Sequence, residues 1–143
     1  MLVKQLSVFI ENRAGRLAAA TRVLAEHEIN ILALSLADTA DYGILRMIVS
    51  APQEACALLK DAGFTVVVNR ALAVEVEDRP GGLDDVLRVL ESEGINLEYM
   101  YAFASVRIGR AALIFRFSDN EAAFDALTQA GVGMLSSVDV LEG

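Results

Sequence analysis

The sequence has one cysteine, one histidine and no tryptophan among its 143 residues. A single cysteine excludes an internal disulfide and is typical of reducing compartments, so we expect a cytoplasmic location. One histidine and one cysteine are too few for the usual metal sites, and no nucleophile stands beside a convincing base. We therefore expect no catalytic residue, no metal and no enzyme activity.

Basic residues are also scarce, because 12 Lys and Arg face 20 Asp and Glu and give a net charge of −8. Affinity for nucleic acid comes mainly from Lys and Arg, so no nucleic-acid partner is expected. No charge-free stretch reaches the roughly 18 residues that cross a bilayer, and no basic leader with an apolar core is present. Glycine-rich phosphate loops are missing as well. We expect neither membrane insertion nor a cofactor.

Apolar residues, in contrast, make up 55% of the sequence, and the chain contains a duplication. Residues 12–31 and 78–97 align without a gap, and eight of these 20 pairs are identical. Farther on, residues 50–64 align with 118–132 at a spacing of 68 instead of 66. The spacing change predicts a hairpin two residues longer in the second copy. We place the two units at 1–69 and 70–143, with only Asn69 and Arg70 between their strands.

Each copy has the same pattern of predicted elements. Alternating apolar residues predict a strand, and apolar residues at i, i+3, i+4 and i+7 then predict an amphipathic helix that begins near Leu17 or Leu83. Two strands, a helix ended by Gly63 or Gly131, and a last strand follow. The later strands are expected at 29–37, 43–50 and 65–69, and at 95–105, 111–118 and 134–140. The fold class is therefore α+β, with two tandem ferredoxin-like β-α-β-β-α-β units.

A polar elbow precedes the first helix of each copy, ENRAGRL at 11–17 and EDRPGGL at 77–83. Asn12 and Asp78 suit the N-cap position, and Pro80 suits the first helical position. Capping does not explain Gly15 and Gly81, since glycine costs roughly 0.5–1 kcal/mol in a helix relative to alanine. The repeated glycine indicates that something approaches the backbone closely.

The elbow has the chemistry of a zwitterion site. Amides at a helix start bind carboxylate or phosphate, and Asn12 or Asp78 can accept a hydrogen bond from an ammonium group. A small amino acid carries both groups. Arg13 and Arg79 fit either as clamps for the carboxylate or as solvated surface residues, and the sequence leaves both interpretations open.

The repeated pattern N/D-R-x-G-x-L, a helix, and then I-N-I or I-N-L resembles the ACT domain, a small regulatory module that binds amino acids. The resemblance covers essentially the whole chain and is greatest with stand-alone tandem ACT proteins. It implies that an asparagine of the elbow and one of the I-N segment contact the ligand, and that the elbow glycine admits it. The implied ligand-binding residues are Asn12, Arg13, Ala14, Gly15, Asn30 and Ile31 in the first copy, and Asp78, Arg79, Gly81, Asn96 and Leu97 in the second.

Two residues depart from the family pattern. Ala14 stands where a proline is usual, which should loosen the first elbow slightly. Asp78 stands where asparagine is usual and adds a negative charge. We therefore expect the second site to prefer an ammonium or basic ligand, or to be degenerate.

The resemblance further implies that units pair edge to edge through their second strands, with ligands at the seam. Such pairing within one chain would place two consecutive strands about 29 Å apart, whereas Asn69 and Arg70 reach only about 10–11 Å. We therefore expect a homodimer in which Asn12 or Asp78 shares its ligand with Asn30 or Asn96 of another domain. Strand exchange within the chain is the alternative.

These patterns favour a non-enzymatic regulatory protein that binds an amino acid and reports it through its association. The alternative is a ligand-free interaction subunit that docks on a metabolic enzyme or regulator. A small-molecule enzyme on the same fold ranks third.

Overall fold

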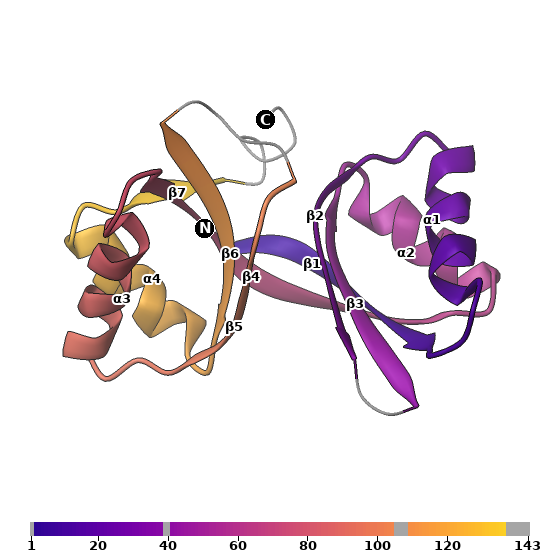
Figure 1. The fold of residues 1–143 in the computed structure, drawn as a ribbon, viewed down its shortest axis with the longest axis horizontal. Coiled ribbons are helices and arrows are strands. Elements are labelled where there is room, and N and C mark those ends of the chain that lie inside the picture. The colour runs from indigo at the N-terminus through magenta and orange to yellow at the C-terminus, as the bar shows by residue number, and fades with distance from the viewer. Residues whose placement is uncertain (1, 39–40, 105–108, 137–143) are drawn as a thin grey trace. The chain divides into compact units, whose positions relative to one another are not determined.

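The computed structural model describes residues 2–38, 41–104 and 109–136, and its elements follow the predicted order twice (Figure 1). The first copy comprises β1 (Leu2–Glu11), α1 (Arg16–Glu26), β2 (Ile31–Asp38), β3 (Tyr42–Val49), α2 (Pro52–Asp61) and the beginning of β4 (Thr65–Glu77). The second comprises the remainder of β4, α3 (Gly82–Ser92), β5 (Leu97–Ala102), β6 (Arg110–Phe117), α4 (Asn120–Gln129) and β7 (Gly133–Leu135). The predicted tandem α+β arrangement is confirmed.

The chain forms two compact units. One unit holds Lys4–Asn69, and the other holds the described residues from Arg70 onward together with Leu2 and Val3. Asn69 and Arg70 lie inside β4, so the two strands expected on either side of them are one continuous strand. The strand continues because its sequence, TVVVNRALAVEVE, contains no proline or glycine that would interrupt extended backbone.

Each unit has an antiparallel sheet covered on one face by its two helices (Figure 1). In the unit Lys4–Asn69, β3 pairs with β1 and β2, and β4 is the other neighbour of β1. In the second unit, β6 pairs with β4 and β5, and β7 pairs with β4. Within the described residues, β2 and β5 therefore stand at the ends of the strand order.

The second hairpin is longer by two residues, as predicted. Leu36 of β2 pairs with Leu45, nine positions farther along the chain. The counterpart of Leu36 in the second copy, Ala102, pairs with Leu113, eleven positions farther along. Residue 105 of the predicted strand 95–105, and residues 137–140 of the predicted last strand, lie outside the described residues.

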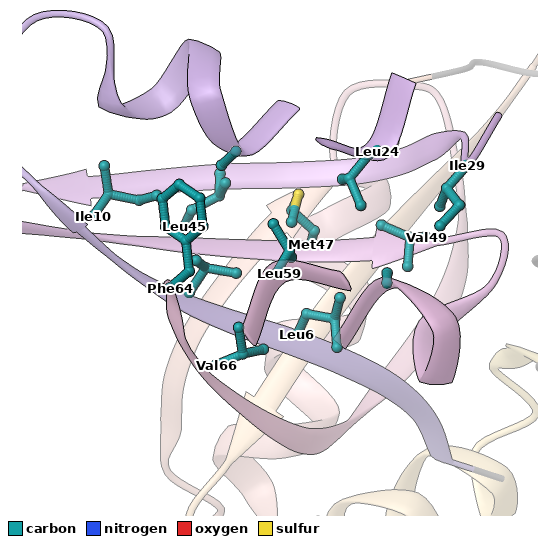
Figure 2. Close-up of a cluster of buried hydrophobic side chains, with 13 residues drawn as sticks. Leu6, Ile10, Leu24, Ile29, Leu45, Met47, Val49, Leu59, Phe64 and Val66 are labelled. Atoms are coloured by element: carbon teal, nitrogen blue, oxygen red, sulfur yellow. The ribbon is translucent and has the colours of Figure 1, made fainter. Parts of the chain in front are cut away.

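The core of the unit Lys4–Asn69 lies between its sheet and its helices (Figure 2). Leu6, Leu45, Met47 and Leu59 are fully buried there. The alternating apolar residues of β1, Leu6, Val8 and Ile10, all belong to this core, because period-2 alternation places them on one face of the sheet. Leu72, Phe115 and Leu127 are buried in the corresponding cluster of the second unit.

The C-terminal ends of the second helices also match the prediction. Gly63 and Gly131 follow α2 and α4 with φ values of +93° and +76°, in the left-handed region that glycine adopts without strain. None of the described helices combines the length and the apolar character needed to cross a membrane.

Candidate functional site

Each elbow turns on a glycine. Gly15 and Gly81 are themselves the N-cap residues of α1 and α3, with φ values of +87° and +86° and no side-chain capping bond. Asn12 and Asp78 are therefore not the N-caps, and Pro80 precedes the N-cap instead of opening the helix. A Cβ at Gly15 would meet nothing within 4 Å, so the backbone conformation by itself explains the glycine.

The first elbow is held by backbone hydrogen bonds at its two ends. The amide of Asn12 donates to the Asp41 carbonyl at 3.1 Å, and the Gly15 carbonyl accepts from the Ala19 amide at 2.9 Å. The exposed Arg13 side chain makes an ion pair with Glu11, with 2.9 Å between Nε and Oε2. The elbow therefore presents a cationic side chain next to a helix start, where the first-turn amides have no intrahelical partner.

A cavity of about 160 Å³ opens at this elbow. The register of the sheet explains its position, because Gly43 of β3 pairs with Ile10 of β1 on one side and with Asp38 of β2 on the other. A Cβ at Gly43 would lie 3.0 Å from the Leu36 side chain, so glycine leaves room for that leucine. The lining residues are Ile10, Glu11, Asn12, Arg13, Leu17, Leu36, Asp38 and Gly43.

This lining combines three kinds of chemistry. Arg13 can bind a carboxylate through charge-assisted hydrogen bonds, and the carboxylates of Glu11 and Asp38 can accept from an ammonium group. Leu17 and Leu36 supply apolar surface. The arrangement suits a zwitterion that carries an uncharged side chain.

Asn30 and Ile31 do not line this cavity. They line an open depression of about 520 Å³ along α1 and the start of β2, together with residues such as Thr21 and Arg22. The backbone amide of Asn30 donates to Ser50 Oγ at 2.9 Å. The structure therefore places Asn12 and Asn30 at two different hollows of one unit.

The second elbow has the same backbone but different side-chain contacts. Arg79 Nη2 lies 2.7 Å from Asp85 Oδ2 in the first turn of α3, and Nη1 donates to the Pro80 carbonyl at 3.0 Å. Arg79 also pairs with Glu77. The hydrogen bonds to Glu77 and Asp85 raise the pKa of the exposed Arg79 guanidinium above its usual value. This arginine is already surrounded by acceptors of its own chain.

The start of α3 packs tightly against the preceding strand. A Cβ at Gly82 would lie only 2.0 Å from the carbonyl oxygen of Glu77. The counterpart of Gly82 in the first unit is Arg16, whose guanidinium carbon lies 4.6 Å from the centre of the Phe64 ring. The two helix starts are therefore packed in different ways.

Of the remaining predicted residues of the second copy, Asn96 and Leu97 lie at the start of β5, and Asp78 lies at the elbow directly after β4. Asn96 donates from Nδ2 to Ser118 Oγ at 3.1 Å, and Leu97 pairs with Phe117. Asp78 is exposed, and its amide donates to the Gly109 carbonyl at 3.0 Å. The I-N segment of each copy precedes an irregularity in the strand register, after Ile31 and after Leu97.

Sequence reasoning missed two acidic residues of these elbows, Asp38 and Asp85. Asp38 reaches the first elbow only through the pairing of β2 with β3, so no local motif marks it. A signal for Asp85 was present, because the gapless alignment sets it opposite Ala19. A carboxylate in the first helical turn of only one copy indicates that the two elbows differ.

Comparisons with known proteins agree with this architecture. The sequence matches the family model described as an ACT domain pair over residues 1–141. A crystal structure of protein BT0572 from Bacteroides thetaiotaomicron is 38% identical, covers 100% of this chain and 98% of that chain, and has a TM-score of 0.94.

More distant structures share the fold. The ligand-free regulatory subunit of aspartate kinase from Thermus thermophilus is 21% identical, covers 90% of this chain and 93% of that chain, and has a TM-score of 0.64. The regulatory subunit from Thermus flavus is 19% identical, covers 92% and 94% of the two chains, and has a TM-score of 0.60. A search of curated proteins gave no match.

Proposed function

Because the chain belongs to the family of ACT domain pairs, we propose that it is a non-enzymatic, cytoplasmic regulatory protein that binds an α-amino acid. The observation that carries the proposal is the cavity at the first elbow, where Arg13 stands beside the carboxylates of Glu11 and Asp38. An arginine and carboxylates that line one small hollow can bind the two ends of a zwitterion. The apolar surface of Leu17 and Leu36 favours an amino acid with an uncharged side chain.

A second domain completes the binding site for the ligand. Asn12 and Asn30 lie at separate hollows of the same unit, so a ligand that contacts both kinds of residue takes them from two domains. In a homodimer, the elbow of one domain supplies the arginine, and the start of β2 in the other supplies the asparagine. A ligand held in this way stabilises the pair through its higher affinity for the associated state.

A thermal-shift screen of the full chain against the twenty amino acids tests this function. A ligand at 100 times its dissociation constant should stabilise the protein by about 2.7 kcal/mol, which raises the melting temperature by several degrees. The screen should identify one amino acid or a few of similar shape. The D-enantiomer of the amino acid that is found serves as the control. If none of the twenty amino acids changes the melting temperature, the protein does not bind an amino acid in the way proposed.

The edge strand β2 is the expected dimer contact. Leu34 and Leu36 are 44% and 49% exposed on this strand, in a position where another sheet edge can pair with it. We expect a dimer by sedimentation, and we expect Leu34→Lys to shift it to monomer, because pairing would bury a charge. Val67→Lys, at a similarly exposed valine of β4, should leave the dimer intact. A parent protein that sediments as a monomer at tens of micromolar with ligand present would contradict the dimer.

The second candidate function is a ligand-free subunit that docks on a metabolic enzyme. The same exposed leucines of β2 favour it, since they suit any apolar partner surface. The two candidates differ in the screen, because a docking subunit would be stabilised by its partner enzyme and by none of the amino acids.

A further inference from the structure

We propose that the Asp85 carboxylate fills, in the second elbow, the place that a ligand carboxylate takes in the first. The chain then binds one amino acid, at the elbow of Asn12 and Arg13, and the second elbow is occupied by its own side chain. This inference rests on the proposed function and adds to it the number of sites and the residue that decides it.

The partners of the two arginines are the first argument. Arg13 has one ion pair among the described residues, to Glu11 at 2.9 Å. Arg79 has the corresponding pair to Glu77 and adds a second, to Asp85 at 2.7 Å, as well as a bond to the Pro80 carbonyl. A ligand carboxylate that binds Arg79 through Nη2 competes with Asp85 for this group. One exposed ion pair of this kind changes an equilibrium constant by up to roughly fivefold.

The charge around each elbow is the second argument. Residues 11–22 contain three arginines and one glutamate, which gives a net charge of +2. The aligned residues 77–88 contain two arginines and four acidic residues, which gives −2. Helix α3 begins with Asp84 and Asp85 in its first turn, whereas the first turn of α1 has no acidic residue. Two carboxylates at a helix start oppose the binding of a third, so the second elbow repels the anionic end of an amino acid.

The walls of the two elbows are the third argument. Leu36 and Asp38 line the first cavity, and Gly43 leaves space for the leucine. Their counterparts in the second copy are Ala102, Ala104 and Ala111. The second elbow therefore lacks the apolar surface of Leu36 and the carboxylate of Asp38 that the first offers to a ligand.

Equilibrium dialysis of the full chain against each of the twenty amino acids in turn tests the inference. The parent protein should saturate at one ligand per chain, and Asp85→Ala should approach two, with binding at the second elbow up to about fivefold tighter than any residual binding there in the parent. Alanine is the residue that the first copy has at the equivalent position, so this change makes the second elbow resemble the first. The double variant with Asp85→Ala and Arg13→Gln should bind its ligand only at the second elbow.

Asp84→Ala is the matched control, because it removes the same charge from the same helical turn. Asp84 pairs with Arg88 at 2.8 Å and not with Arg79, so this variant should still bind one ligand. Binding of two ligands per chain by the parent would overturn the inference. Binding of a basic amino acid at the second elbow of the parent would overturn it as well. One ligand per chain in Asp85→Ala would also overturn it. The absence of binding in both parent and variants would instead overturn the proposed function.

Discussion

Replacing Gly82 by alanine is expected to lower the free energy of unfolding by about 3 kcal/mol, the upper part of the usual range for overpacking. The added Cβ would lie 2.0 Å from the Glu77 carbonyl oxygen and 3.1 Å from its carbonyl carbon. Both atoms belong to the backbone of β4, so the clash cannot be relieved by rotating a side chain. The first turn of α3 would have to move away from the strand. The better helix propensity of alanine, about 1 kcal/mol, offsets only part of this cost.

Urea unfolding of the two variants Gly82→Ala and Gly15→Ala would separate the two reasons for a glycine at these elbows. Gly15 has open space around its Cβ position, but its φ is +87°. Its replacement should therefore cost only about 1–2 kcal/mol, the strain of an alanine in the left-handed region. An unfolding midpoint for Gly82→Ala equal to that of the parent would show that α3 and β4 are not in this close contact.

Replacing Arg13 by glutamine is expected to weaken amino-acid binding by about 10- to 150-fold. A hydrogen bond to a charged group contributes about 1.5–3 kcal/mol, and each 1.4 kcal/mol is a factor of ten in affinity. The Arg13 side chain is 63% exposed and pairs only with the exposed Glu11 among the described residues. The variant should therefore keep the stability of the parent, since surface ion pairs contribute little.

Calorimetric titration of Arg13→Gln with the amino acid found in the screen would measure this loss. Arg79→Gln is the matched control, because it removes the equivalent charge from an elbow where Asp85 already occupies the arginine. Its affinity should stay within about twofold of the parent. Equal affinities of Arg13→Gln and the parent would mean that the carboxylate is not bound at the first elbow.

The duplicated fold was predictable from the sequence because its signals are local. Alternation over a few residues of β1, helical spacing from Leu17 and glycines at 63 and 131 each depend on the backbone of one short segment. The longer second hairpin was also predictable, because a spacing that changes from 66 to 68 has to be accommodated in a connection. The continuous strand β4 was not, since strand patterns on both sides of Asn69 and Arg70 are compatible with either one strand or two.

The site required the tertiary structure. The sequence identified the elbow, but each N-cap lies three residues later than predicted, because positive φ makes Gly15 and Gly81 the N-caps instead of Asn12 and Asp78. The cavity exists because the register of β3 brings Asp38 to the elbow. Glu11 and Asp38 are 27 positions apart in the chain, and they line one cavity only because the strands pair. Local sequence thus determined the elements and the chemistry of the elbow, and non-local pairing decided which charges surround it.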